Sequence, residues 1–117
     1  MKRKNCCPIA QALGVLGDKW SLIVLRDVIF GKKRHFNDLL ASPEKISTNI
    51  LSNRLKTLQK ESLLCCSVDL ENRRSKIYTP TEKAQDLVPV LVELYKWGEK
   101  YNHRADTKEN PMQDEPF

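Results

Sequence analysis

Apolar residues recur at helical spacing along most of this chain, and two short runs of strand-forming residues interrupt the pattern. The pattern predicts helical segments at about residues 8–17, 18–31, 35–40, 47–60 and 81–98. Pro8 suits a first helical turn, Gly17 suits a helix end, and Asp18 and Ser47 suit N-caps. Pro89 should kink or divide the last segment, because proline cannot donate the backbone hydrogen bond that a continuous helix needs.

The two strand-forming runs predict a hairpin between the fourth and the last helical segments. They cover residues 64–69 and 77–79, and the turn between them is Leu-Glu-Asn-Arg-Arg-Ser. Thr79 or Thr81 can then cap the last helix. The order of elements predicts a mainly α fold with a small β part (α+β). In it, a short helix, a turn and a second helix form a helix-turn-helix unit, and the hairpin forms the wing.

The helix after Ser47 has one apolar face and one polar face. We expect Ile50, Leu51, Leu55 and Leu58 on the inner face. The polar residues on the outer face are Ser47, Thr48, Asn49, Ser52, Asn53 and Lys56. Asparagine can bond adenine in two ways, serine and threonine can bond several base edges, and lysine can reach guanine or phosphate. An ordinary solvated face is the alternative, but the helix-turn-helix context favours contact with the major groove.

Basic residues flank this polar helix. The chain has 117 residues, a net charge of +5 and a pI of about 9.1, which favour a single domain with a polyanionic partner. The hairpin tip carries Arg73, Arg74 and Lys76, and a second cluster precedes the short helix with Lys32, Lys33 and Arg34. Either cluster can contact phosphates, so we predict double-stranded DNA as the partner. A solvated hairpin tip is the alternative for the first cluster.

Several other classes of protein and site are not indicated. The basic N-terminus lacks an apolar signal-peptide core, and no apolar run approaches the ~18 residues of a membrane span. We therefore expect a cytoplasmic protein with no membrane partner. The histidines lack a third ligand at metal spacing, so we expect neither a metal site nor a cofactor. The nucleophile, phosphate-loop and paired-carboxylate patterns of enzymes are missing, and we expect no catalytic residues.

An ordered set of motifs resembles the HxlR family of bacterial winged helix-turn-helix regulators. The matching runs include Leu-Gly-Val-Leu-Gly-Asp-Lys-Trp (13–20), Ile-Val-Leu-Arg-Asp (23–27), Arg-His-Phe-Asn-Asp-Leu (34–39), Leu-Ser-Asn-Arg-Leu-Lys-Thr-Leu (51–58) and Tyr-Thr-Pro-Thr-Glu (78–82). The resemblance extends from Cys7 to Gly98. It differs at Glu61-Ser62, where the family's glycine would give a left-handed helix cap. The wing lacks the family's frequent proline, and the frequent glycine in the last helix is replaced by Ala84 or Gln85.

The resemblance implies a homodimer that presents two recognition helices to a two-fold DNA operator. It implies dimerisation through the first and last helices, where the candidate interface residues are Ile9, Leu13, Leu91, Leu94, Tyr95 and Trp97. We accordingly assign residues 1–6 to a basic N-terminal arm and residues 7–103 to the winged helix-turn-helix domain with its dimerisation helices. Residues 104–117 are polar and contain two prolines, so we assign them to a disordered tail.

The cysteines leave a second interpretation open. Some members of the resembled family sense oxidants or electrophiles through the cysteine that matches Cys7. This residue could be such a sensor, activated by the helix N-terminus and nearby lysines, or a buried and inert thiol. Of Cys65 and Cys66, which lie in a predicted strand, we expect one to face inward in a structural role. Trp20 and Trp97 could line an effector pocket, but core and dimer packing are favoured.

These observations define three hypotheses for function. The first is a sequence-specific, dimeric transcription regulator. The second is a thiol-based sensor of oxidants or electrophiles whose output is DNA binding. The third is a protein-interaction module that has lost DNA binding, which the basic face argues against because charges are depleted at protein interface cores.

Overall fold

The computed structural model of the chain describes residues 7–102 and Met112. The predicted basic arm and the predicted tail, apart from Met112, lie outside the described residues. The elements in chain order are α1 (Pro8–Leu16), α2 (Lys19–Ile29), α3 (Phe36–Leu40), α4 (Thr48–Lys60), β1 (Leu64–Val68), β2 (Lys76–Pro80), α5 (Glu82–Gln85) and α6 (Val88–Tyr101). The architecture is the predicted one, with a two-stranded hairpin following a helix-turn-helix unit.

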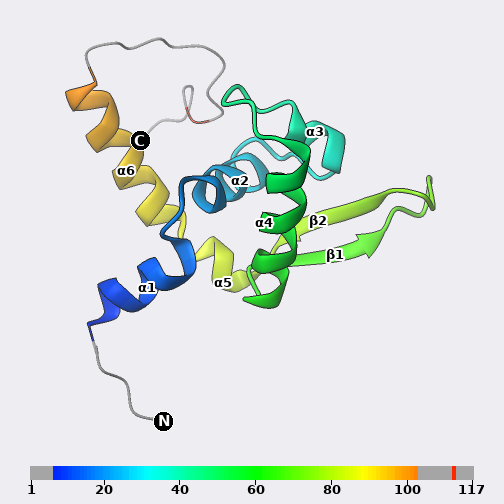
Figure 1. Cartoon of the computed structure of the whole chain (residues 1–117), viewed down its shortest axis with the longest axis horizontal. Helices are drawn as coiled ribbons and strands as arrows, with labels where there is room; N and C mark the ends of the chain where they lie inside the picture. Colours follow the sequence, from blue (N-terminus) through cyan, green and yellow to red (C-terminus); the bar gives the residue numbers. More distant parts are fainter. Residues whose placement is uncertain (1–6, 103–111, 113–117) are drawn as a thin grey trace.

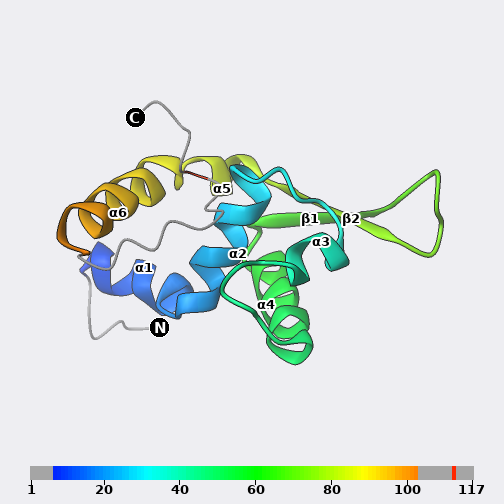
Figure 2. The ribbon, with the colours of Figure 1, turned by 90° about the horizontal axis from the view of Figure 1, so that it is seen from above.

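Helix α2 lies at the centre of the molecule. Helices α3 and α4 and the base of the hairpin pack on one side of it, and α1 and α6 lie on the other (Figures 1 and 2). The largest fully buried side chains come from α2, α3, α4 and the segment after α4; they are Leu25, Leu39, Leu51, Leu58 and Leu63. Trp20 packs partly buried against this core. The core therefore fixes α4 on a rigid base and leaves its opposite face outside.

One residue expected on the inner face of α4 is not there. Leu51, Leu55 and Leu58 follow the helical spacing and are buried, whereas Ile50 is exposed. A residue next to Leu51 is turned by about 100° around the helix axis, so the same core cannot cover both side chains.

Predicted caps set the starts of three helices. The Asp18 carboxylate accepts the Ser21 backbone N–H at 2.9 Å, and the Ser47 hydroxyl accepts the Ile50 N–H at 3.2 Å. Thr81 caps α5, and Pro89 lies in the first turn of α6, so the last predicted segment is divided as expected.

Helix α1 ends at Gly17, as predicted. A Cβ added there would lie 2.3 Å from the Leu13 carbonyl oxygen, so this close approach of the chain requires glycine.

The end of α4 has the left-handed cap that its lack of glycine argued against. Ser62 takes that conformation, with a φ of 63°. The Leu63 N–H donates to the Leu58 carbonyl at 2.8 Å, and the Ser62 N–H donates to the Gln59 carbonyl at 3.0 Å. These two bonds, with Leu58 and Leu63 buried in one cluster, form a Schellman motif. The hydrogen bonds and apolar contacts compensate for the strain of a non-glycine residue.

The hairpin projects away from the helices (Figure 1). Its strands pair antiparallel, from Leu64 opposite Pro80 to Val68 opposite Lys76. In β1 only Leu64 is buried, and Cys65 and Cys66 are both exposed. The expectation that one of these cysteines faces inward is therefore wrong, because the strand leaves the core directly after Leu64.

Candidate nucleic-acid interface

The outer face of α4 is polar and accessible. Five of the six predicted contact residues on this helix are exposed, namely Ser47, Thr48, Asn49, Asn53 and Lys56, and Ser52 is half-buried. The Ser47 oxygen accepts the bond that caps the helix, which leaves its hydroxyl hydrogen available as a donor. The helix contains no acidic residue, so its face can approach a phosphate backbone without charge repulsion.

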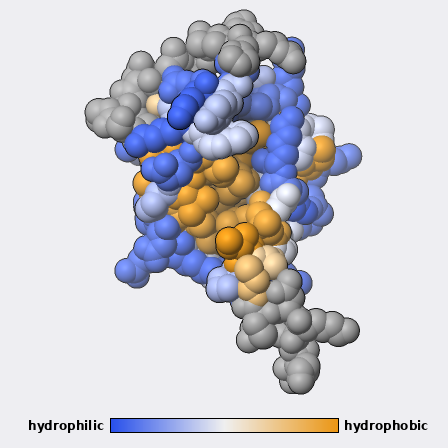
Figure 3. Space-filling model, turned by 90° about the vertical axis from the view of Figure 1, so that its left-hand side faces the viewer, coloured by the Kyte–Doolittle hydropathy of each residue, from blue (hydrophilic) through white to orange (hydrophobic). Residues whose placement is uncertain are grey.

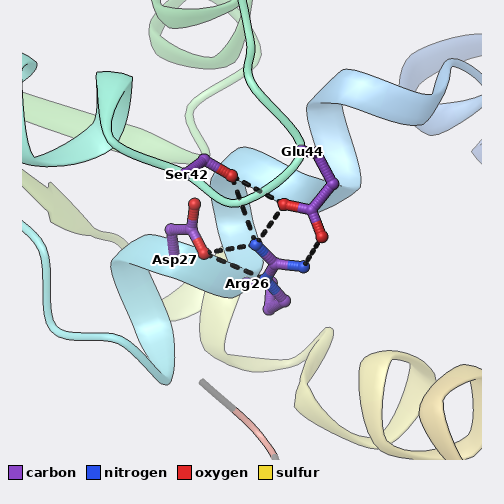
Figure 4. A network of polar contacts seen from close by, with 4 residues as sticks. All are labelled: Arg26, Asp27, Ser42 and Glu44. Carbon is purple, nitrogen blue, oxygen red and sulfur yellow. Dashed lines mark hydrogen bonds and ion pairs between the residues drawn. The ribbon is translucent and has the colours of Figure 1, made fainter. Parts of the chain in front are cut away.

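A buried ion-pair network fastens the turn between α3 and α4 to the central helix (Figure 4). The Arg26 guanidinium of α2 bonds Asp27 Oδ1 at 2.7 Å and both carboxylate oxygens of Glu44 at 2.8 Å. The Ser42 hydroxyl donates to Glu44 Oε1 at 2.7 Å. The bonds from Arg26 and then Ser42 lower the pKa of Glu44 to about 2. The network fixes the turn, and hence the direction in which α4 leaves it.

Sequence reasoning did not identify this network. Its signal in the sequence is a pair of adjacent opposite charges, Arg26 and Asp27, inside the otherwise apolar run of residues 22–29. The Asp27 side chain is only 1% exposed, and buried charges require partners. The pair therefore indicates an ion-pair site, but its partner Glu44 is identified only by the fold.

A second contact that the sequence did not predict joins α4 to the start of α2. The Arg54 guanidinium donates to Asp18 Oδ2 at 2.8 Å and lies 3.5 Å from the Ser21 hydroxyl. Arg54 also donates to the amide oxygen of Asn53. Burial alone would raise the pKa of Asp18, but the bonds from Ser21 and the charge of Arg54 lower it below its ordinary value. Arg54 thus points toward the protein body, although it lies on the recognition helix.

The basic residues divide into an exposed group and a supporting one. Arg73, Arg74 and Lys76 are exposed on the wing, as is Lys32, and Lys33 is half-buried. Arg34 instead donates from its guanidinium to the Val28 carbonyl, and its own carbonyl accepts the Tyr78 N–H of β2 at 2.8 Å. Arg34 therefore braces the base of the wing against α2, a role that its place in a basic run did not indicate.

The wing is also tied to the helix-turn-helix unit by a side chain. His35 is the N-cap residue of α3, and its Nε2 lies 3.1 Å from Asp69 Oδ2 at the end of β1. Its Nδ1 lies 3.6 Å from Asp38 Oδ2. The Glu71 backbone N–H, and then His35, lower the pKa of Asp69. This link holds the wing beside α3 and α4.

Apolar side chains gather on the face formed by α1 and α6, far from the wing (Figure 3). Of the predicted dimer residues, Ile9, Leu13, Leu94 and Trp97 are exposed, Tyr95 is half-buried and Leu91 is buried. Trp97 is 66% exposed, so it does not pack into the core of its own chain. An open groove of about 770 Å³ runs beside it, lined by Pro89, Val90, Glu93, Leu94 and Trp97.

The Cys7 thiol lies at this same end of the molecule. Cys7 is the N-cap residue of α1 and is exposed. The alternative in which it is a buried thiol within the subunit is therefore wrong. Among residues 7–102 and Met112, no three acidic, histidine or cysteine residues cluster closely enough to hold a metal ion. Over the same residues, no helix has the length and apolarity needed to cross a membrane.

The comparisons with known proteins all point to helix-turn-helix regulators. The HxlR-like helix-turn-helix family matches residues 15–106 of this chain. The HTH-type transcriptional regulator YdeP of Bacillus subtilis is 34% identical over 103 residues, which are 88% of this chain and 80% of YdeP. The HTH-type transcriptional regulator YodB of the same organism is 29% identical over 107 residues, which are 92% of this chain and 95% of YodB.

Solved structures share the fold. The crystal structure of PA1607 superposes with a TM-score of 0.77 at 32% identity, covering 91% of this chain and 72% of that one. The reduced form of YodB superposes with a TM-score of 0.65 at 27% identity, covering 87% of this chain and all of that one. YodB has also been solved bound to quinone and after treatment with diamide.

Proposed function

Because the chain belongs to the HxlR-like helix-turn-helix family and is a transcriptional regulator by that membership, we propose that two copies of it bind a two-fold DNA operator. The observation that carries the proposal is the outer face of α4, which is polar, free of acidic residues and held rigidly by the Arg26–Glu44 network. A rigid helix with donors and acceptors on its outer face suits direct reading of bases in the major groove. A protein that acts on chromosomal DNA would work in the cytoplasm.

The two parts of this interface have different tasks in the proposal. Asn49, Ser52 and Asn53 contact base edges, with Ser47, Thr48 and Lys56 beside them at the groove. Arg73, Arg74 and Lys76 of the wing contact phosphates, with Lys33 behind them, and supply affinity without sequence preference. Arg34 holds the base of the wing against α2.

Dimerisation is the other half of the proposal. Ile9 and Leu13 of α1 and Leu94 and Trp97 of α6 are exposed on the face where apolar side chains gather, and an exposed apolar patch of this kind marks an interface. A second copy placed on this face by a two-fold axis buries the same residues on both sides. Leu91 is already buried in its own chain and adds little.

The test is a binding titration by fluorescence anisotropy. The probes are DNA that flanks the gene of this protein and a scrambled duplex of equal length. We expect tighter binding to the flanking DNA, and Asn49→Ala should reduce the difference between the two probes. Equal affinity for both probes, together with no preference for any sequence in a library of random duplexes, would contradict the proposal. That result would favour the interaction module.

A second candidate function is thiol sensing. Cys7 is exposed at the N-terminus of α1, beside the apolar face, and the related YodB has been solved in reduced, quinone-bound and diamide-treated forms. We propose that a thiol-reactive electrophile or oxidant acts on Cys7 and changes DNA binding through the packing of α1. A quinone would add to the Cys7 sulfur through one ring carbon, and the thiol proton would move to the quinone oxygen.

The test repeats the titration after treatment with benzoquinone, for the wild type and for Cys7→Ser. The matched control is Cys65→Ser, which removes an exposed thiol from the wing. We expect the wild type and Cys65→Ser to respond and Cys7→Ser to be unaffected. If Cys7→Ser responds as the wild type does, Cys7 is not the sensor.

A further inference from the structure

Two asparagines lie one helical turn apart on the outer face of α4, and their amide groups differ in the hydrogen bonds that they make. Both Asn49 and Asn53 are exposed. Within the described part of the chain, the Asn49 side chain makes no hydrogen bond, so its amide can turn either way. The amide oxygen of Asn53 accepts a hydrogen bond from Arg54. The same residue type therefore offers different hydrogen-bonding groups to DNA at these two positions.

Arg54 is held in place by residues at the start of α2. Its guanidinium donates to Asp18 Oδ2 at 2.8 Å and lies within 3.5 Å of the Ser21 hydroxyl. Asp18 and Ser21 are themselves joined by two hydrogen bonds of 2.9 and 2.7 Å at the capped start of α2. The Arg54 side chain is only 24% exposed. The arginine is thus fixed to the protein body and cannot follow the DNA without breaking an ion pair.

The chemistry of the guanidinium fixes the orientation of the Asn53 amide. A guanidinium has only N–H donors, so the atom of Asn53 that faces it must be the oxygen. The amide NH₂ is then the group of Asn53 that is left to face DNA in the proposed complex. Turning the amide over would place donor against donor and lose a charge-assisted hydrogen bond.

From this orientation we infer that Asn53 reads guanine and Asn49 reads adenine, and that Arg54 sets the difference. The inference rests on the proposed placement of α4 in the major groove. Reading adenine in two ways requires an amide oxygen for the N6 amino group and an amide NH₂ for N7. Asn49 can present both. Asn53 has its oxygen engaged by Arg54 and offers chiefly the two donors of its NH₂, and guanine is the base whose major-groove edge has two adjacent acceptors, N7 and O6.

The experiment selects binding sites from a library of random duplexes and compares the base preferences of four proteins. They are the wild type, Asn49→Ala, Asn53→Ala and Arg54→Met. The alanine variants identify the position that each asparagine reads, because base preference is lost there. We expect guanine at the position lost in Asn53→Ala and adenine at the position lost in Asn49→Ala.

Arg54→Met removes every donor that faces Asn53 and keeps a side chain of similar length. The freed amide can then present its oxygen, so the ratio of adenine to guanine at the Asn53 position should rise on the order of tenfold. The adenine at the Asn49 position should stay. A general loss of stability would lower affinity at all positions alike and would not change one base, so the base identity separates positioning from folding.

Each other outcome has a defined meaning. Adenine at the Asn53 position in the wild type, or guanine retained there in Arg54→Met, overturns the inference. So does an Asn53→Ala variant that changes no position. If the wild type enriches no sequence, the proposed function fails and the inference fails with it. Should Arg54→Met fail to fold, the wild type and the two alanine variants still decide whether Asn53 reads guanine.

Discussion

Arg26 and Glu44 meet fork to fork, with both guanidinium end nitrogens 2.8 Å from the two carboxylate oxygens. This geometry joins the centre of α2 to the turn that leads into α4, across 18 positions of sequence. Bidentate pairs fix direction as well as distance. The direction of the recognition helix therefore depends on a carboxylate that touches no base in the proposed complex.

We predict that Glu44→Gln lowers the free energy of unfolding at pH 7 by about 1–2 kcal/mol. The loss is below the full value of a buried pair, because the Glu44 side chain is 29% exposed and water screens it in part. Urea unfolding followed by circular dichroism measures it. Glu71→Gln, which changes an exposed carboxylate in the wing turn, is the control and should leave stability unaltered.

The same pair predicts a dependence on acid. The pKa of Glu44 is about 2 in the folded chain, below its ordinary value of 4.5, so ionised Glu44 favours the folded state. Its contribution is complete above about pH 4.5 and is lost as the pH falls toward 2. The stability difference between wild type and Glu44→Gln should therefore shrink over that window. A difference that stays constant down to pH 2 would contradict the assignment.

The wing arginines should contribute affinity without specificity. Replacing Arg73 and Arg74 by alanine should weaken binding to operator and random DNA by the same factor, because phosphates are common to both. The slope of log K against log salt should fall by about two units for two lost contacts. Titrations between 50 and 300 mM salt measure this. Lys100→Ala, at the far end of α6, removes one positive charge away from the wing and is the control. Normal binding by the double variant at every salt concentration would exclude the wing contact.

The local features of the fold were predictable from the sequence, and the long-range ones were not. Asp18 and Ser47 were identified as N-caps because a cap depends on residues three positions away. The pairs Arg26–Glu44 and Arg54–Asp18 join residues 18 and 36 positions apart, and no local pattern indicates which charges will meet. The cap at Ser62 was missed because residue preference argued against it, whereas tertiary packing of Leu63 decided it.

The candidate interface was predictable to a similar extent. The polar face of α4 follows from helical spacing, so its residues could be named in advance. Which of them already accept hydrogen bonds within the protein could not be predicted. Asn53 accepts one from Arg54, and Arg54 is itself held by Asp18 at the start of α2. Arg34 shows the same limit, since its charge suggested phosphate and its position gives it the Val28 carbonyl.

His35 should affect DNA binding only through the wing. Its Nε2 is 3.1 Å from Asp69 Oδ2, and this link aligns the hairpin with the helix-turn-helix unit. We predict that His35→Ala weakens DNA binding about three- to tenfold in the wild type, the size of one ordinary hydrogen bond, because both partners are partly exposed to water. In the Arg73→Ala/Arg74→Ala background the same change should have a much smaller effect, because only Lys76 of the wing is then left to contact phosphate.

The control for this double-mutant cycle is His35→Gln, whose amide NH₂ can still donate toward Asp69 and should restore part of the affinity. Additive effects of His35→Ala and the arginine changes would mean that His35 acts on the recognition helix and not on the wing.

Leu94→Asp should convert the proposed dimer into monomers. Leu94 is exposed in the single chain, in a groove with Trp97, and a carboxylate there would be buried without a partner at the proposed two-fold interface. Sedimentation velocity at micromolar concentration measures the change in mass. The matched control is Leu70→Asp, the same substitution at an exposed leucine of the wing turn, which should leave the dimer intact. A monomer should also bind a two-fold operator far more weakly than the dimer does, because each half-site then binds independently. If Leu94→Asp stays dimeric while Leu70→Asp does not, the wing and not the face of α1 and α6 joins the two copies.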